Sequence, residues 1–488
     1  MSEGRRVVVV GGGLAGITAA LDCAEAGAQV TLLEVRRRLG GAVYSVAREG
    51  LEMDNGQHVF LRGCLAYIGL LERLGSVHLT RVQERLRIPV LAPGSEPFIL
   101  RRSSLPAPAH LAGALARYPH LSPSQRVGAA RAALALMALG EREQRLDRET
   151  LGRWLARHGQ DESAVAALWD LIALPTLNLP AAEASLALGA FVFRRGLFSS
   201  AGDGDIGFHV GTLADIVGRP AERALARAGV RVMLGWRAEG VQRTAGGIEV
   251  SGRGASGEGG EGAEGLSAEA VVVALPHARA AALLEPLAGE LAARIARLGA
   301  SPIVNLHVLY DRTVCEHPFA AGVGTPVQYL FDRTEAAGAP SGSQYLAISL
   351  SGASREMAMS VPALRERYLP ALRELLPAAR GANVESFLVT REHAATFRAS
   401  PGVQALRPGA EIGVPGLYLA GTWTDTGWPA TLESAVLSGH AAAAAALRRL
   451  GIKGAATPAA RPLRPPRDGS PPAEALAPLA RAVGGEHG

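Results

Sequence analysis

The sequence predicts an α/β fold whose parallel sheet is assembled from distant parts of the chain. Three observations predict it. Residues 7–34 have the pattern of a strand, a glycine-rich turn, a helix and a second strand. Residues 271–275 form another uninterrupted apolar run, and residues 417–447 combine a strand with a helix. Between these segments lie an alanine- and leucine-rich stretch and several strand candidates, which indicates a second domain interleaved with the first.

The first element, Val7–Val10, has four β-branched residues without a polar interruption, as expected of a strand buried on both faces. Glycines then follow at GxGxxG spacing. This spacing allows a tight turn, the close approach of a pyrophosphate and close packing of a helix on a strand. The helix N-terminus directs its N–H groups at the phosphates. The residues expected at a dinucleotide here are Gly11, Gly13, Leu14, Ala15 and Gly16.

The second strand, Gln29–Leu33, ends at Glu34. A carboxylate at this tip can accept hydrogen bonds from both hydroxyls of an adenosine ribose. A glycine motif alone is weak, because a glycine-rich turn can exist without a ligand. The strand, helix, second strand and acid occur in the required order, which favours a Rossmann-like dinucleotide site.

The run that follows has the form E-x-R-x-R-x-G-G and resembles the FAD-binding oxidoreductases of the amine oxidase and phytoene desaturase type. The resemblance implies a glutathione-reductase/amine-oxidase type domain that binds FAD, in which glycines border the pyrophosphate and arginines neutralise it. That family usually has arginine after the glycine pair, and this chain has Ala42. The alternative is a solvated charged turn. The residues concerned are Arg36, Arg38, Gly40 and Gly41.

Residues 416–439, GLYLAGTWTDTGWPATLESAVLSG, resemble the flavin-closing segment of carotenoid and squalene desaturases. The resemblance implies that the helix N-terminus points at the pyrimidine end of the flavin, where its positive potential stabilises the reduced ring. That group usually has aspartate at position 422, where this chain has threonine. The residues expected around the flavin are Gly421, Thr422, Thr431 and Leu432, together with Gly56, Val232 and Ala274 from earlier segments.

Two further stretches resemble the hydroxysqualene dehydroxylases, or squalene-associated FAD-dependent desaturases. They are residues 54–60, DNGQHVF, and residues 174–180, LPTLNLP, with 183–185, EAS. The resemblance runs from about residue 7 to residue 447. It implies a reductive reaction in which hydride from reduced FAD replaces the hydroxyl of hydroxysqualene, giving squalene and water.

Such a reaction needs an acid near the departing hydroxyl. We expect it among His58, Asp54 and Asp425, because they lie on the two segments expected to reach the flavin. The alternatives are that His58 caps a turn and that Asp54 bonds local backbone. No residue spacing indicates a metal site.

A C30 isoprenoid has almost no polar groups, so its binding depends on apolar burial, roughly 25 cal/mol per Å². We therefore expect a tunnel with aliphatic and aromatic lining, and the alternative for each lining residue is ordinary core. The candidates are Trp169, Leu174, Leu177, Phe191, Phe193 and Trp428.

The formal charge of +5 comes without a basic block carrying interleaved aromatics, which excludes nucleic-acid binding. The three cysteines have neither metal nor redox spacing, and no apolar stretch reaches membrane-spanning length. A cytoplasmic protein is expected. The helices predicted over residues 105–139 carry Arg117, Arg126 and Arg131, which indicates peripheral contact with anionic lipid at the inner face of the membrane. No motif indicates the electron donor.

These patterns predict a division of the chain. The expected FAD-binding parts are residues 1–75, 205–300 and 411–450, the helical insertion is 76–204, and the substrate-domain sheet is 301–410. Residues 246–265 are expected to be a mobile hairpin tip, and residues 451–488 a disordered tail rich in proline and alanine.

Three alternatives share this fold. A phytoene-type desaturase would run oxidatively on a similar polyene. A flavin amine oxidase usually holds a lysine near the flavin, and the single lysine of this chain is Lys453. A prenyl-carrier protein would keep the architecture without catalysis, but the intact glycine and acid positions favour a flavin.

Overall fold

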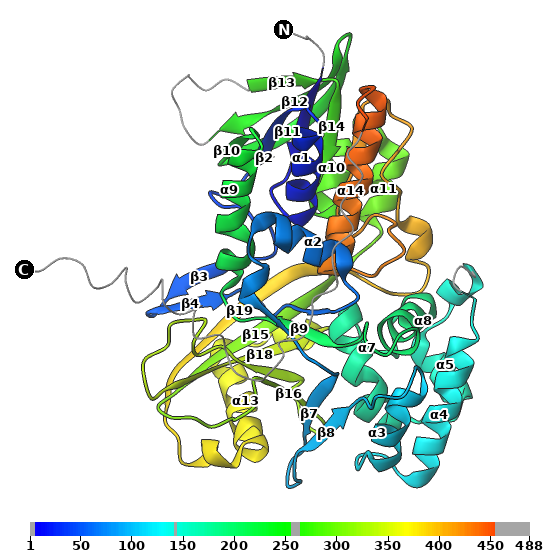
Figure 1. Cartoon of the computed structure of the whole chain (residues 1–488), viewed down its shortest axis with the longest axis vertical. Helices are drawn as coiled ribbons and strands as arrows, with labels where there is room; N and C mark the ends of the chain where they lie inside the picture. The colour runs from blue at the N-terminus through cyan, green and yellow to red at the C-terminus, as the bar shows by residue number, and fades with distance from the viewer. Residues whose placement is uncertain (1–4, 141–143, 255–263, 454–488) are drawn as a thin grey trace, which may run out of the picture.

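The computed structural model describes residues 5–140, 144–254 and 264–453. The half drawn uppermost in Figure 1 contains a five-stranded, fully parallel sheet. Its order is β10 (Arg231–Leu234), β2 (Gln29–Glu34), β1 (Arg6–Val10), β14 (Ala270–Val273) and β20 (Leu417–Leu419). Strands from the N-terminal, middle and C-terminal parts of the chain are therefore neighbours in one sheet.

Alternate residues of β1 enter different cores, as the period of two in a strand requires. Val7 and Val9 pack with helices, and Val8 and Val10 pack on the opposite face. The helices of the first face are α1 (Leu14–Glu25), α2 (Leu65–Leu74), α9 (Arg219–Arg227) and α14 (Leu432–Arg449). The second face is covered by the antiparallel strands β11 (Trp236–Thr244), β12 (Gly247–Gly254) and β13 (Glu264–Ala268), with α10 (His277–Leu284) and α11 (Gly289–Ala296).

The lower half of Figure 1 is built on a seven-stranded mixed sheet. Its order is β19 (Val384–Phe397), β15 (Ala300–Tyr310), β18 (Gln344–Ser351), β17 (Tyr329–Asp332), β16 (Phe319–Gly322), β7 (Arg87–Leu91) and β8 (Phe98–Arg101). The β16–β7 pair is parallel and the other pairs are antiparallel. Helix α13 (Val361–Leu375) packs its apolar side against this sheet.

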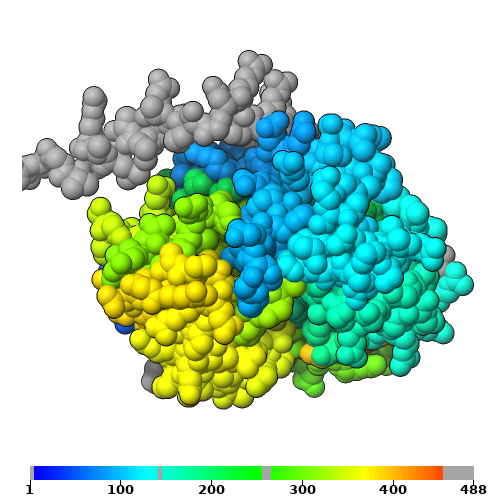
Figure 2. All heavy atoms as spheres, turned by 90° about the horizontal axis from the view of Figure 1, so that it is seen from below, coloured from blue at the N-terminus to red at the C-terminus, as the bar shows by residue number. Residues whose placement is uncertain are grey.

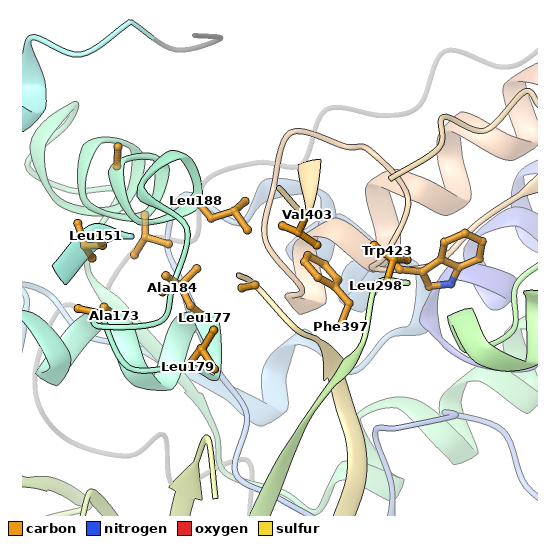
Figure 3. Packing of buried hydrophobic residues seen from close by; sticks show 14 of the residues in the cluster. Leu151, Ala173, Leu177, Leu179, Ala184, Leu188, Leu298, Phe397, Val403 and Trp423 are labelled. Atoms are coloured by element: carbon orange, nitrogen blue, oxygen red, sulfur yellow. The ribbon is translucent and has the colours of Figure 1, made fainter. Parts of the chain in front are cut away.

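Small sheets join the halves. Strand β9 (Ile206–His209) pairs with β5 (Val59–Leu61) and β6 (Thr80–Val82), and β3 (Ser45–Arg48) pairs with β4 (Leu51–Asp54). The helical part contains α3 (Ala112–Arg117), α4 (Pro123–Met137), α5 (Leu151–Arg157), α7 (Asp170–Leu177) and α8 (Leu186–Phe193). Its core is continuous with the rest: in Figure 3, Leu151 and Leu188 of the helical part lie in one cluster with Phe397, Val403 and Trp423.

The helical part begins later than predicted. Residues 77–101, expected in the helical insertion, contain one 3-10 turn, Val77–Leu79, followed by β6, β7 and β8, and the next helical turn starts at Ala109. Strands β7 and β8 carry short continuous apolar runs on the two sides of the turn at 92–97, and each forms part of the mixed sheet. The predicted mobile tip falls partly, and the predicted disordered tail largely, outside the described residues.

Candidate active site

The predicted pyrophosphate site lies at the carboxyl end of β1. Helix α1 packs so closely here that a Cβ added to Gly16 would stand 1.9 Å from the Gly11 carbonyl oxygen, so only glycine fits. The helix begins at Leu14, and its N-cap, Gly13, provides no side-chain cap. There is also no acidic residue in its first turn. The first N–H groups of α1 are therefore available to an anion.

Glu34 stands beside this turn at the end of β2 and is buried. One carboxylate oxygen accepts a hydrogen bond from the Gly12 amide at 2.7 Å, and the other accepts one from the Arg36 amide at 2.8 Å. Two backbone donors thus fix the carboxylate, and each oxygen retains a lone pair for a ribose hydroxyl.

Arg38 lies against the glycine pair that follows. A Cβ on Gly41 would stand 2.7 Å from the Gly13 Cα, so the two glycine segments are in direct backbone contact. Arg38 Nη1 donates to the Gly41 carbonyl at 3.2 Å, and its guanidinium lies 3.7 Å from the Tyr44 ring centroid. Its Nη2 is buried without a partner among the described residues. Burial and the Arg36 charge lower the pKa of Arg38, so the site favours an anionic ligand.

Residues 54–58 are held by contacts from several elements. Asp54 accepts from Ser45 Oγ at 2.7 Å and from the Leu213 amide at 2.8 Å through one oxygen, and from Arg333 at 2.9 Å through the other. Burial raises the pKa of Asp54 while Arg333 lowers it. Through these three donors, Asp54 holds the loop 54–58 in place.

The next residue, Asn55, places its carbonyl between two donors of the mixed sheet, Asn305 Nδ2 at 2.9 Å and Thr390 Oγ1 at 3.1 Å. Its own Nδ2 donates to Glu392 at 2.9 Å. Asn305 Oδ1 and Gln57 Nε2 are buried atoms without a partner in the described part of the chain. Two unpaired polar atoms beside Gly56 indicate that the loop borders a ligand site.

His58 is partly buried, and desolvation lowers its pKa to about 4. The neighbouring His209 is buried, lies 2.9 Å from the Tyr67 hydroxyl through Nε2, and has a pKa lowered by burial to about 3. Both imidazoles are therefore neutral at pH 7. A neutral imidazole still donates one hydrogen bond.

The C-terminal segment follows β20, the edge strand of the parallel sheet. The Gly421 amide donates to Ser438 Oγ at 2.8 Å, and Trp423 Nε1 donates to the Leu275 carbonyl at 2.9 Å. Leu275 follows Ala274, the first residue after β14. Thr431 caps α14 through a reciprocal bond with Ser434, and Leu432 is its first residue. Thr422 is partly exposed, as is Val232 of β10, which pairs with Leu32 of β2. Asp425 is exposed, and its side chain accepts from the Gly427 amide.

Sequence reasoning missed Arg407. It is 5% exposed and donates to the carbonyls of Thr424 at 2.5 Å and Trp428 at 2.8 Å. Its guanidinium lies 5.0 Å from the Phe397 ring centroid. Burial lowers its pKa to about 10. Arg407 therefore fixes the loop that carries Thr422 and Asp425, but no motif marks an arginine that acts on backbone carbonyls. Asn305, Glu392 and Arg333 were missed because their partners, Asn55 and Asp54, lie more than two hundred residues away in the chain.

The predicted lining residues fall into two groups. Phe191 and Trp428 meet with ring centroids 5.1 Å apart, joining the helical part to the C-terminal segment. Trp169 and Phe193 pack edge to face inside the helical part, with centroids 5.0 Å apart, and Leu177 is buried in the same cluster. Leu174 is partly exposed and lies near Gly352 of the mixed sheet.

The chain was compared with known proteins. The sequence model of the flavin-containing amine oxidoreductases matches residues 14–447. The chain belongs to this family. Accordingly, it is a flavin-dependent oxidoreductase, as the sequence predicted.

Several curated members of the amine oxidoreductase superfamily match nearly the whole chain. Hydroxysqualene dehydroxylase of Rhodopseudomonas palustris is 29% identical over 90% of this chain and 97% of its own length. The enzyme of the same name from Zymomonas mobilis is 27% identical over 90% of this chain and 98% of its own length. Zeta-carotene desaturase of Synechocystis is 23% identical over 91% of this chain and 97% of its own length. The predicted resemblance to hydroxysqualene dehydroxylases is confirmed.

Solved structures of the amine oxidoreductase family share the fold. A putrescine oxidase variant superposes with a TM-score of 0.69 at 18% identity, covering 91% of this chain and 99% of its own. Cyclohexylamine oxidase from Brevibacterium oxydans superposes with a TM-score of 0.67 at 18% sequence identity, covering 92% of this chain and 100% of its own. The predicted α/β flavoprotein fold with a substrate domain is confirmed.

Within the described residues, none of the helices combines the length and the apolar character needed to cross a bilayer.

Proposed function

We propose that this chain binds FAD and catalyses the reductive dehydroxylation of hydroxysqualene to squalene. The observation that carries the proposal is the identity of 27–29% over nine tenths of the chain to three proteins named hydroxysqualene dehydroxylase. The site geometry supports it independently of those names.

The residues fit a dinucleotide form of flavin. The α1 N-terminus and Arg38 Nη2 would hold the pyrophosphate, and Glu34 would hold the ribose of the adenosine. At the other end, Gly421, Thr431 and the α14 N-terminus would border the ring. A flavin mononucleotide would leave the adenosine half of this site without a ligand, which favours FAD.

When bound and reduced, FAD supplies a hydride to the carbon that carries the hydroxyl. The carbon–oxygen bond breaks, and one proton converts the departing hydroxide to water. We assign to His58 the hydrogen bond to that oxygen, because its neutral ring can donate while remaining uncharged in an apolar site. Asp54 is assigned to positioning the loop 54–58, since three donors occupy its carboxylate. Asp425 is assigned to stabilising its own turn, through the hydrogen bond from the Gly427 amide.

The substrate is proposed to lie between the helical part and the C-terminal segment, where Phe191 meets Trp428. The FAD-binding parts would then be the three predicted segments, and residues 301–410 with the helices would form the substrate domain. A developing allylic cation is tolerated by aromatic faces in a water-poor pocket.

The test is anaerobic incubation of the flavin-reduced holoenzyme with hydroxysqualene, with product analysis and flavin absorbance recorded together. We expect squalene and stoichiometric reoxidation of the flavin. The relation to zeta-carotene desaturase supplies the competing outcome. If the reduced enzyme gives no squalene while the oxidised enzyme desaturates a carotene, the chain is a desaturase.

A further inference from the structure

A cavity of about 470 Å³ opens at the end of the molecule remote from the parallel sheet. Figure 2 views this end and shows the β7–β8 hairpin in blue beside the cyan helices of the helical part. The cavity lies between that hairpin and α3. Its lining residues are Arg87, Phe98, Ile99, Arg101, Ala114 and Arg117.

The polar part of this lining carries one sign of charge. Arg87, Arg101 and Arg117 are exposed, and no carboxylate lines the cavity with them. Within the described residues, none of these three guanidinium groups makes an ion pair or a hydrogen bond. Burial, and then the charge of Arg87, lower the pKa of the nearby His317, whereas Glu316 acts in the opposite direction. Three unpaired cations around one cavity repel each other and are stabilised by an anion.

The surrounding surface continues this pattern. Residues 97–140 contain five arginines and no aspartate or glutamate, and of the five Arg102 is paired with Asp205. Large apolar side chains are exposed in the same segment: Leu105 at 53%, Val127 at 53% and Leu134 at 61%. Val127, Arg131 and Leu134 lie on one exposed face of α4, which is therefore both apolar and cationic.

One arginine predicted at this surface is used elsewhere. Arg126 donates through Nη1 to the Ala116 carbonyl at 2.9 Å and ties α4 to α3. Arg117 and Arg131 remain exposed. The cationic face is therefore formed by β7, β8, α3 and the outer side of α4.

We propose that this face docks on an anionic phospholipid bilayer and that the cavity takes one phosphate headgroup. Guanidinium groups bind phosphate oxygens with charge-assisted hydrogen bonds. Phe98 and Ile99 offer apolar contact to the acyl chain below the headgroup, and Leu134 and Val127 enter the interface. A free phosphate ion would use the arginines only, so the exposed apolar residues favour lipid. The inference does not depend on which isoprenoid the enzyme converts.

The experiment uses the full-length holoenzyme and cosedimentation with phosphatidylcholine vesicles, with and without phosphatidylserine. The test variant combines Arg87→Gln, Arg101→Gln and Arg117→Gln. The matched control combines Arg223→Gln, Arg227→Gln and Arg294→Gln, three exposed arginines of α9 and α11 that remove the same charge elsewhere. A third variant carries Val127→Ser and Leu134→Ser.

We expect salt-sensitive binding to the anionic vesicles, weakened about five-fold per cavity arginine and roughly a hundred-fold in the triple variant. The control should bind nearly as the unaltered enzyme does, and the serine variant should bind less. Unchanged flavin content would show that each variant is folded. Equal binding to neutral vesicles, or equal loss in test and control, overturns the proposal. A second result would also overturn the proposal: no binding to vesicles, together with protection of the cavity arginines by inorganic phosphate against a guanidine-modifying reagent. The site would then take a free ion.

Discussion

The contacts of Arg38 indicate that an anionic ligand binds beside its side chain. Its Nη1 is satisfied by a backbone carbonyl, whereas Nη2 is buried with no partner among the described residues. A buried charged donor left without an acceptor is costly, and a phosphate oxygen would supply the acceptor. The usual arginine at position 42 is replaced by alanine, so this contact rests more heavily on Arg38.

We predict that Arg38→Gln weakens FAD binding about 10- to 100-fold, the effect of losing a hydrogen bond to a charged group. Fluorescence titration of the apoprotein with FAD measures it. The control is Arg37→Gln, an exposed neighbour, which should bind FAD as the unaltered chain does. Equal affinities of the two variants would contradict the assignment of Arg38 to the pyrophosphate.

His307 gives a pH prediction at the same scale. It is 1% exposed, lies 2.6 Å from the Tyr345 hydroxyl, and burial lowers its pKa to about 4. In the unfolded chain its pKa is about 6.5, so between pH 6.5 and 4 the unfolded state binds the proton and the folded state does not. The free energy of unfolding therefore falls as the pH drops through this range, by up to about 1.4 kcal/mol per pH unit.

The variant His307→Gln lacks this titration, so its stability should decline less steeply from pH 6.5 to 4.5. Urea unfolding at several pH values compares the two slopes, and the comparison cancels the other titrating groups. Parallel slopes would show that His307 is protonated in the folded state.

At the scale of elements, local patterns were sufficient where a motif is continuous in sequence. Strand β1, helix α1, strand β2 and Glu34 were predicted because their signals fall within 34 residues and each agrees with the next. Strands β7 and β8 were not predicted. They are short, Pro89 interrupts the first, and β16, which joins β7 to the rest of the mixed sheet, lies more than two hundred residues away in the chain.

Site roles depended on still longer contacts. Asp54 looked like a candidate acid, but its partner Arg333 is 279 residues distant, and nothing near Asp54 in the sequence reveals it. Arg407 acts over a shorter separation, on the carbonyls of residues 423, 424 and 428, which are 16 to 21 residues away, but no motif marks these contacts either. Sequence patterns predict which loops border the flavin, whereas tertiary contacts determine which side chains remain free for chemistry.

Replacing Arg407 tests the role of this loop. We predict that Arg407→Met lowers the free energy of unfolding by about 3 kcal/mol, because it leaves buried carbonyls without donors. Release of flavin should also become faster. Urea unfolding and flavin release are both measurable by fluorescence. The control Arg448→Met removes an exposed ion pair with Glu411 and should change stability by less than about 0.5 kcal/mol.

At the scale of the whole molecule, the parallel sheet can form only after distant segments have met. Strand β14 stands between β1 and β20, and Glu433 of α14 accepts hydrogen bonds from the first amides of α2 at 2.8 and 3.0 Å. The N-terminal and C-terminal parts of the described chain are therefore joined at α14, whose N-terminus is proposed to border the flavin. Asn305 and Thr390 of the mixed sheet bind the Asn55 carbonyl in the loop 54–58, which is also proposed to border the flavin.

Flavin binding should consequently stabilise the molecule as one unit. A ligand at one hundred times its dissociation constant adds about 2.7 kcal/mol to the folded state, which for a chain of this length raises Tm by about 3 °C. We predict this shift for the unaltered apoprotein on addition of FAD, seen equally in the tryptophan fluorescence and the circular dichroism. Arg38→Gln at the same FAD concentration should show little shift. If instead one early transition stays unchanged and only a later one moves, the mixed-sheet half unfolds independently, and its contacts with residues 54–58 do not couple it to the flavin.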